Sequence, residues 1–391
     1  MNDIENLLKR HKFVIFGSDH YNTLGAVRSL GEKGIAPDLI LHPHYRENPI
    51  FSNNSRYVGK VYIVKTVEEG FELLLKKYGN EPFPPFVYSC DDWVESILDL
   101  HRNELLNRFY FFHGNVQGVV TRYMDKDTIC RLAKDCGLIV PNTELVKRGQ
   151  LPQTLKYPII TKSQNSTRGG WKEDVYICNN EKELLLAYRS IKSDDILLEE
   201  FIDKETEFSF NAFSFNDGKR IFLPYKITCL RSKPGTYGKY LKYTLAGKEE
   251  RDTIDSIRKM IKTIGFCGVF SVDFLKGKDG KNYFLEVNFR NSAFSYPVTY
   301  GGINMLYCWA KGMLGCDVEN DTNPRYKDFK ALVEVQDFQD SVLTKDVSPL
   351  RWIYELITAN CLFYFNKKDL KPTFAHILHL LKKLCKKIVR L

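Results

Sequence analysis

The chain has 391 residues, which is long enough for two or three domains with substantial cores. Its hydrophobic content of 43% and charged content of 27% are ordinary for a globular protein, and no stretch approaches the roughly 20 apolar residues that span a bilayer. Most of the net charge of +9 comes from residues 366–391, which contain eight Lys or Arg and one Asp, so the charge of the whole chain does not support a nucleic-acid partner.

The ten cysteines include no C-x-x-C and no paired spacing, which argues against a zinc site and against a disulfide framework. The first residues, M-N-D-I-E-N-L-L-K-R-H-K, are amphipathic and contain two acids, unlike a secretory signal. We therefore expect free thiols in a reducing cytosol.

The first part of the chain alternates strands and helices. Strands are predicted at 13–17, 37–41, 61–64 and 86–89, with a helix at 24–30 after the first of them. The loop that follows the first strand, G-S-D-H-Y-N-T-L-G, lacks the G-x-G-x-x-G spacing of dinucleotide sites. Residues 1–120 are therefore predicted to form a Rossmann-like α/β domain that serves as a parallel-sheet scaffold.

A strand that ends in a lysine follows a helix predicted at 126–136. This strand, Y-P-I-I-T-K, covers 157–162 and ends at Lys162. It leads into S-Q-N-S-T-R-G-G at 163–170, whose glycines and hydroxyl groups can close over phosphates. No G-K-[ST] follows, so this is not a P-loop, and an ordinary surface loop is the alternative.

From residue 196 the sequence I-L-L-E-E-F-I-D-K-E-T-E-F-S-F indicates a strand, a short acidic hinge and a second strand from Glu207. Such a hinge suits an adenine pocket in which the backbone reads the base and a carboxylate binds the ribose. A hairpin with a charged turn is the alternative. Residues 223–238 then read as a basic, glycine-bearing loop before a helix near 252–264, and such cations occur near transferred phosphates as well as in solvent.

Residues 270–291, F-S-V-D-F-L-K-G-K-D-G-K-N-Y-F-L-E-V-N-F-R-N, contain the strongest hairpin signal. If Asp279-Gly280 form a two-residue turn, Asp273 lies opposite Glu286. Alternation then places Asn288 and Arg290 on the same face. A divalent cation such as Mg²⁺ would relieve the repulsion between the two carboxylates; a chance acid pair on a solvated face is the alternative.

The end of the chain is basic and amphipathic. From Pro372 the sequence predicts a helix over 373–391, with an apolar stripe along one side and most lysines on the other. Such a helix can lie on anionic lipid. Packing on the body of the protein with a solvated basic face is the alternative.

Taken in order and spacing, these segments resemble the ATP-grasp superfamily, in particular its carboxylate–amine ligases of the D-aspartate ligase and D-alanine–D-alanine ligase types. The resemblance covers roughly residues 12–315, and V-D-F-L…F-L-E-V-N-F-R is its most specific part. It implies a pre-grasp domain at 1–120, an ATP-grasp domain at 121–320 with a small lobe (121–195) and a large lobe (196–320), and a helical C-terminal extension at 321–391.

The resemblance also implies roles for individual residues. Asp273, Glu286 and Asn288 would ligate Mg²⁺, and Arg290 would stabilise the acyl-phosphate transition state. The expected nucleotide contacts are Lys126, Lys162, Ser166, Gly169 and Gly170 at the phosphates, Glu199, Glu200, Phe201 and Ile202 along the purine, and Glu207 at the ribose. Lys226 and Arg231 are hypothesised to contact the γ-phosphate or a substrate carboxylate, and Asn291 and Ser295 are candidates for substrate contacts.

Two departures from the family pattern bear on these assignments. Phe289 stands where many relatives have Pro, although the expected metal ligands are intact. The hinge at 203–206 lacks a glycine that is common there, so the ribose-binding glutamate could shift by one or two residues.

The implied activity is an ATP-dependent ligation that uses ATP and two Mg²⁺ ions, for which Mn²⁺ could substitute. A substrate carboxylate attacks the γ-phosphate to form an acylphosphate, and an amine then displaces phosphate to form an amide. The expected substrates are small molecules of the amino-acid or cell-envelope precursor class, and the expected location is the cytoplasm, with peripheral contact at the inner face of the membrane as an open question. A carboxylase or other acylphosphate-forming enzyme and a non-catalytic nucleotide-binding protein are the alternatives.

Overall fold

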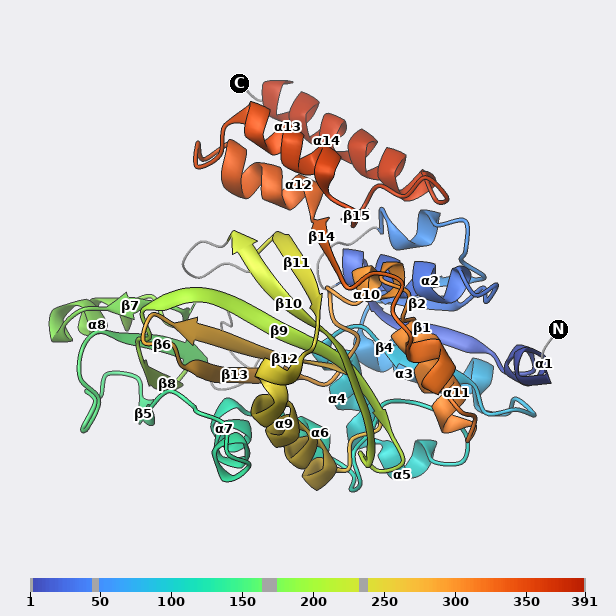
Figure 1. The fold of residues 1–391 in the computed structure, drawn as a ribbon, viewed down its shortest axis with the longest axis horizontal. Helices are drawn as coiled ribbons and strands as arrows, with labels where there is room; N and C mark the ends of the chain where they lie inside the picture. Colours follow the sequence, from blue (N-terminus) through green and yellow to red (C-terminus); the bar gives the residue numbers. More distant parts are fainter. Residues whose placement is uncertain (1–2, 44–48, 164–173, 232–237, 390–391) are drawn as a thin grey trace.

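The computed structural model describes residues 3–43, 49–163, 174–231 and 238–389. Three β-sheets organise these residues: a parallel sheet within 13–89, an antiparallel sheet within 143–200, and a large sheet within 204–362 (Figure 1). In Figure 1 the large sheet lies between the small antiparallel sheet and the parallel sheet, and the last helices lie at one end of the molecule. The predicted α/β fold class is confirmed.

The parallel sheet has the spatial order β3-β2-β1-β4. Its strands are β1 (Phe13–Ser18), β2 (Asp38–His42), β3 (Val61–Ile63) and β4 (Phe86–Ser89). The neighbouring helices are α1 (Asp3–Lys9), α2 (Tyr21–Gly31), α3 (Val67–Tyr78), α4 (Asp92–Leu100) and α5 (Arg102–Leu105), with a 3₁₀ turn η1 at Ser52–Asn54. Side chains of β1 alternate between the two faces: Ile15 joins the core with α2, and Phe16 joins the core with α3 and α4. Burial on both faces explains why β1, β2 and β4 are predicted well from continuous apolar runs.

The small lobe follows two helices, α6 (Val119–Tyr123) and α7 (Lys126–Asp135). Its sheet has the order β5-β8-β6-β7. The strands are β5 (Thr143–Lys147), β6 (Ile159–Ser163), β7 (Ile177–Cys178) and β8 (Asp195–Glu200), and α8 (Glu181–Ala187) packs on them. Because β8 pairs with both β5 and β6, residues 195–200 belong to the small lobe, which moves the boundary between the lobes from the expected 195 to about 200.

The large sheet has seven strands in the order β13-β12-β9-β10-β11-β14-β15. The strands are β9 (Lys204–Phe215), β10 (Arg220–Arg231), β11 (Tyr240–Leu245), β12 (Gly268–Gly277), β13 (Asn282–Asn288), β14 (Asp328–Leu332) and β15 (Cys361–Leu362). The associated helices are α9 (Arg251–Ile264), α10 (Tyr296–Tyr300) and α11 (Met305–Met313), with 3₁₀ turns η3 (Lys248–Glu250) and η4 (Glu319–Thr322). The prediction of a loop from 223 is wrong as far as 231, because β10 continues there as a strand between β9 and β11.

The C-terminal part begins inside the large sheet, since β14 and β15 extend that sheet at one edge. Its helices are α12 (Glu334–Asp337), the π-helical turn η5 (Phe338–Val342), α13 (Pro349–Thr358) and α14 (Lys371–Val389). None of the described helices is long and apolar enough to cross a membrane. We call residues 334–389 the C-terminal lobe.

A fully buried ion pair fastens the C-terminal lobe to the N-terminal domain. The Nε atom of Arg28 in α2 donates to Oδ2 of Asp369 at 3.0 Å, and both side chains are inaccessible to solvent. Arg28 also donates to the carbonyl oxygens of Phe363 and Tyr364, at 2.8 and 2.9 Å. Asp369 accepts a further hydrogen bond from Ser55 Oγ at 2.8 Å. The pair is therefore embedded in hydrogen bonds on both sides, as a buried charge pair must be.

Replacing Asp369 should destabilise the fold strongly. Asp369→Ala leaves the Arg28 guanidinium buried without its counter-charge, and we expect a loss of about 3–5 kcal/mol in the free energy of unfolding. Urea unfolding measures this loss. Glu319→Ala is the matched control, because it breaks the exposed pair with Arg220, whose side chains are 49% and 62% accessible, and it should cost no more than about 1 kcal/mol. Equal losses in the two variants would contradict the prediction.

Candidate active site

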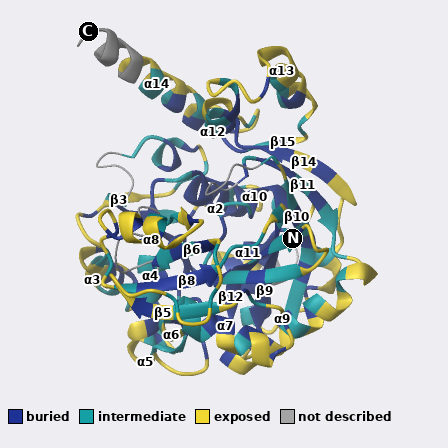
Figure 2. Ribbon diagram, turned by 90° about the vertical axis from the view of Figure 1, so that its left-hand side faces the viewer, coloured by how far each residue is buried: buried dark blue, intermediate teal, exposed yellow. Residues whose placement is uncertain are grey.

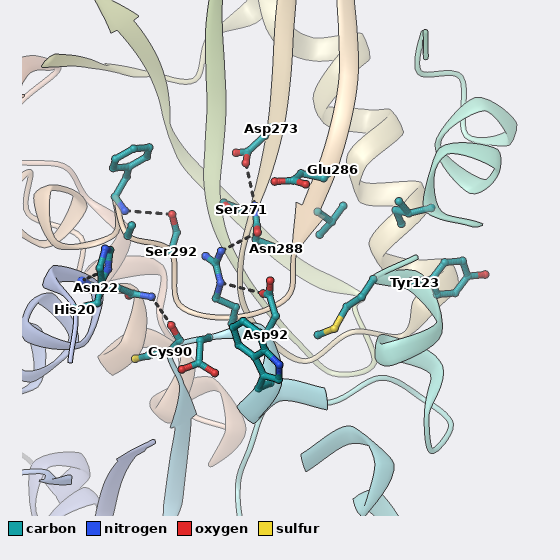
Figure 3. A pocket seen from close by; sticks show the side chains of 18 of the residues that line it. His20, Asn22, Cys90, Asp92, Tyr123, Ser271, Asp273, Glu286, Asn288 and Ser292 are labelled. Atoms are coloured by element: carbon teal, nitrogen blue, oxygen red, sulfur yellow. Dashed lines mark hydrogen bonds and ion pairs between the residues drawn. The ribbon is translucent and has the colours of Figure 1, made fainter. Parts of the chain in front are cut away.

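A pocket of about 200 Å³ lies where the N-terminal domain, the α6–α7 segment and the hairpin β12–β13 meet (Figure 3). The hairpin contributes Asp273, Glu286 and Asn288, and the first position of α7 contributes Lys126. The N-terminal domain contributes Asn22 and the start of α4. The lining residues are thus brought together from segments that are far apart in the sequence.

The register of the hairpin places the two acids opposite each other. Asp273 pairs with Glu286 as predicted. The predicted two-residue turn is wrong, because Gly277 pairs with Lys281 and the loop has three residues, with Gly280 at a φ of 81°. A register shift beyond Asp273 restores the expected pairing at this point. The acid pair therefore depends on a β-bulge that re-aims these side chains beside the pocket.

Hydrogen bonds connect the acid pair to Arg290. Asn288 Nδ2 donates to Asp273 Oδ2 at 2.9 Å, and Arg290 Nη2 donates to Asn288 Oδ1 at 2.8 Å. The Nε atom of Arg290 contacts Asp92 Oδ1 at 3.2 Å, so the guanidinium joins the hairpin to the first turn of α4 (Figure 3). Asp273, Glu286, Asn288 and Arg290 all line the pocket, as expected for residues that share one face of the hairpin.

Burial raises the pKa of Asp273 to about 8, and the charge of Glu286 adds to this effect. Two carboxylates beside an amide oxygen form a donor set that suits a hard divalent cation such as Mg²⁺. Among the residues that the structure describes, no group of three or more His, Cys, Asp or Glu side chains could hold a metal ion by itself. The site thus offers two acids and one amide, which leaves coordination positions for the oxygens of a bound phosphate.

Two lysines lie near the acid pair. Burial lowers the pKa of Lys126, and the charge of Glu286 opposes that change. Lys162 forms an ion pair with Glu199 at 2.5 Å. Burial acts to lower the pKa of Lys162, but neighbouring negative charges, led by Glu199 and including Glu286, together outweigh burial and the pKa is raised. The two lysines interact electrostatically with each other and with Glu286. Lys126 lines the pocket, whereas Lys162 is not among its lining residues.

The four residues of the predicted adenine hinge, 199–202, make different contacts. Glu199 is buried and pairs with Lys162, whereas Glu200 accepts a hydrogen bond from Asn142 Nδ2 at 2.7 Å. The backbone N–H of Phe201 bonds to Pro158, and Ile202 follows at the start of the connection to β9. Glu207 forms an ion pair with Lys204 at 2.6 Å and acts electrostatically on Asp273, so it lies on the side of the acid pair. The predicted phosphate contacts Ser166, Gly169 and Gly170 lie outside the described residues.

The structure does not bring Lys226 into the pocket. Asp273 pairs with Ser209, which pairs with Ile227, whereas Lys226 pairs with Phe210. Because side chains alternate along a strand, Lys226 belongs to the opposite face of the sheet. There it forms an ion pair with Glu250 at 3.1 Å. Its expected contact with a γ-phosphate or substrate carboxylate stays a prediction that these contacts do not support.

Arg231 also has partners elsewhere. Its guanidinium pairs with Asp337 Oδ2 at 2.5 Å and with Glu355 Oε2 at 2.7 Å, both in the C-terminal lobe. These contacts give Arg231 a structural role between the large sheet and the C-terminal lobe. Lys239 is the basic residue of the adjacent stretch that lines the pocket. The sequence shows that the segment around 223–239 is basic. The alternation of side chains along a strand does not show which of its lysines or arginines reaches the pocket.

The two candidate substrate contacts are buried beside the pocket. Asn291 Nδ2 donates to Asn22 Oδ1 at 2.5 Å, and Asn22 Nδ2 donates to the carbonyl oxygen of Asn291 at 2.7 Å. This reciprocal pair joins the hairpin to α2. Ser295 accepts a hydrogen bond from the backbone of Ser292, and it is Ser292 that lines the pocket.

Sequence reasoning missed several lining residues. They are His20, Asn22, Asp92, Trp93, Tyr123, Lys239, Ser271 and Ser292. The signal for Asp92 was the unusual pair of acids at 91–92 after a buried strand. Asp91 caps α4 by accepting from Val94, which leaves Asp92 to reach Arg290.

Comparisons with known proteins reveal distant relatives. No known family model matches the chain. D-aspartate ligase of Enterococcus faecium is 21% identical over 349 residues, which cover 78% of this chain and 76% of that protein. The 2-oxoglutarate carboxylase small subunit of Hydrogenobacter thermophilus is 25% identical over 170 residues, 41% of this chain, and the match spans about a third of that protein (35%).

Solved structures match over most of the chain. N5-carboxyaminoimidazole synthetase of Staphylococcus aureus has a TM-score of 0.66 and 14% identity, with 86% of each chain covered. L-amino acid ligase of Bacillus licheniformis has a TM-score of 0.60 and 17% identity, with 80% of this chain and 75% of that chain covered. At these identities the likeness establishes the fold, and the predicted fold is confirmed.

The raised pKa of Asp273 predicts an unusual pH dependence of stability. Folding raises the pKa from an ordinary 3.8 to about 8, so between these values the native state binds more protons than the unfolded state. The free energy of unfolding of the metal-free protein should therefore fall as pH rises through this range. Asp273→Asn removes the ionisation, and its melting temperature in EDTA should exceed that of the wild type above about pH 8.

Asp328→Asn is the control, because Asp328 is an exposed acid on β14 whose side chain is 68% accessible. This variant should follow the wild type at every pH. A wild type that gains stability up to pH 9, or an Asp273→Asn variant that is less stable throughout, would contradict the assignment.

Proposed function

The chain has the ATP-grasp fold, and we propose that it is an ATP-dependent carboxylate–amine ligase that forms an amide through an acylphosphate. The observation that carries this proposal is the convergence of Asp273, Glu286, Asn288 and Arg290 on one pocket with Lys126. Acidic metal ligands, a phosphate-binding cation and an arginine are the parts that phosphoryl transfer requires.

The cofactors in this proposal are ATP and Mg²⁺, with Mn²⁺ as a possible replacement. A related biotin carboxylase domain of Hydrogenobacter thermophilus 2-oxoglutarate carboxylase was solved with MgADP and bicarbonate, and other structural neighbours were solved with ADP or ATP. Asp273 and Glu286, with Asn288, would hold the metal, which would neutralise charge on the β- and γ-phosphates. Lys126 and Lys162 would bind the phosphates, and the hinge at 199–202 with Glu207 would bind the nucleoside.

The residues of the pocket suggest how the reaction is arranged. A substrate carboxylate positioned beside Arg290 attacks the γ-phosphorus, and ADP leaves. The guanidinium of Arg290 already spans Asn288 and Asp92, so it is held in place before the negative charge develops, which is the condition for effective electrostatic stabilisation. The amine then attacks the acyl carbon and displaces phosphate. The same positioning brings the reactants together and accounts for much of the remaining rate enhancement.

A ligase fits the relatives better than a carboxylase does. The D-aspartate ligase match spans about three quarters of both chains, whereas the carboxylase match spans less than half of this one. A carboxylase remains the second candidate, because the carboxylase match has the higher identity and because N5-carboxyaminoimidazole synthetase shares the fold. We place the reaction in the cytoplasm, since the nine described cysteines are free thiols.

Replacing the charged residues of the pocket should abolish turnover. Glu286→Gln and Arg290→Ala each remove one positioned charge, which we expect to cost about 3–4 kcal/mol of transition-state stabilisation, or a loss of 10²–10³-fold in kcat. Phosphate release from ATP with saturating substrates measures this loss. Arg220→Ala is the control, since this arginine is exposed and pairs with Glu319, and it should keep full activity. Wild-type turnover in either pocket variant would refute the site.

The substrate class can be identified by a phosphate-release screen with ATP and Mg²⁺. A ligase should release phosphate only when a carboxylate and an amine are supplied together, and amino-acid pairs, including D-amino acids, form the first panel. A carboxylase should instead respond to bicarbonate. Tight ATP binding without phosphate release under any of these conditions would favour a nucleotide-binding protein that has no ligase activity.

A further inference from the structure

Two helices of the C-terminal lobe expose apolar stripes to solvent. In α13 the residues spaced i, i+3, i+4 and i+7 are Leu350, Ile353, Tyr354 and Ile357, which are 82%, 47%, 68% and 76% exposed. In α14 the same spacing gives Phe374, Ile377, Leu378 and Leu381, which are 64%, 48%, 53% and 53% exposed. This spacing is that of a single helix face. We call these eight residues the α13–α14 surface.

The opposite side of each helix faces the protein. In α13 the buried residue is Glu355, which binds Arg231. In α14 the buried ring of His376 packs against Phe51 and Tyr364, with ring centroids 4.7 and 4.4 Å apart. In both helices the four exposed apolar residues therefore lie on the side away from these contacts. For the described part of α14, the alternative that its apolar stripe packs on the protein is thus wrong.

The exposed apolar side chains are concentrated in this lobe. Of the 24 exposed large apolar residues among those described, twelve lie between 338 and 381. Figures 1 and 2 are related by a turn about the vertical axis, and α13 and α14 lie at the top in both views. Both stripes are therefore carried by helices at the same end of the molecule. Contiguous exposed apolar area of this kind marks an interaction site.

The charge around the stripes indicates the chemistry of that partner. Lys367, Lys368 and Lys371 are exposed on the segment that leads into α14, and Lys382 is exposed further along it. The sequence continues with Lys383, Lys386, Lys387 and Arg390. A second copy of this surface would bring these like charges together, which opposes self-association. An anionic bilayer accepts the apolar side chains into its interface and the lysines at its head groups.

We propose that the α13–α14 surface binds anionic lipid bilayers, with both helices lying in the membrane interface. The proposal concerns a site other than the ATP pocket, and it holds whether or not the ligase assignment is correct. The sequence predicted that a helix at 373–391 can lie on anionic lipid. The proposal adds a second helix, α13, and states which end of the molecule faces the membrane. The end of the molecule that carries α13 and α14 faces the membrane.

Flotation with lipid vesicles tests this proposal on the full chain. The wild type should float with vesicles of phosphatidylcholine and phosphatidylglycerol and remain unbound with phosphatidylcholine alone. Leu350→Ser with Ile357→Ser in α13, and Phe374→Ser with Leu378→Ser in α14, should each weaken binding about tenfold or more. Replacing Lys367, Lys368 and Lys371 by Gln should weaken it by about fivefold per residue.

The control is Leu185→Ser with Leu186→Ser in α8, which removes two apolar side chains that are 43% and 61% exposed at the far lobe. This variant should bind vesicles like the wild type. Substitutions are used instead of truncation because Asp369 and His376 hold the fold together, and unchanged melting temperatures verify that the variants are folded.

Three outcomes would overturn the proposal. The first is a wild type that does not bind vesicles containing phosphatidylglycerol. The second is an α13 variant that binds as well as the wild type, which would show that α13 takes no part. The third is a dimer in solution that the same substitutions dissociate, as measured by light scattering, which would identify a second copy as the occupant.

Discussion

The arrangement of the site depends on the repulsion between the carboxylates of Asp273 and Glu286, which the neighbouring side chains must offset. Two carboxylates on adjacent strands are unfavourable in a partly buried pocket, and the pKa of Asp273 is raised by burial first and by the charge of Glu286 second. The surrounding groups compensate for it: Asn288 donates to Asp273, and Arg290 and Lys126 supply positive charge. A divalent cation held between the two carboxylates, as in the proposed function, would offset this repulsion.

The compensating groups also tie the domains together. Arg290 reaches from the hairpin to Asp92 at the start of α4, and Asn291 forms its reciprocal amide pair with Asn22 in α2. Arg290, which would stabilise the negative charge of the transition state, is therefore followed directly by Asn291, which holds the hairpin against the N-terminal domain. Such rigid support is what a preorganised catalytic group requires.

Local patterns in the sequence predicted what depends on local physics. Buried parallel strands, the helix at 126–135 and the facing acids all follow from periodicity and turn chemistry. The hairpin pairing was correct even though its turn was not, because a bulge compensated for the extra loop residue. Periodicity does not encode contacts over long separations, such as those of Arg231 with Asp337 and Glu355, which are more than a hundred residues away. Amphipathic spacing in α13 and α14 likewise does not say which face meets the protein.

The Arg28–Asp369 pair bears on how the chain is made. Every side-chain hydrogen bond described for Arg28 goes to residues 363–369, more than 300 positions downstream. While the ribosome is still producing the middle of the protein, the helix that carries Arg28 cannot seal its interior, because a buried guanidinium without an acceptor is costly. We therefore expect the side of α2 that carries Arg28 to become buried only after residues 363–369 have emerged.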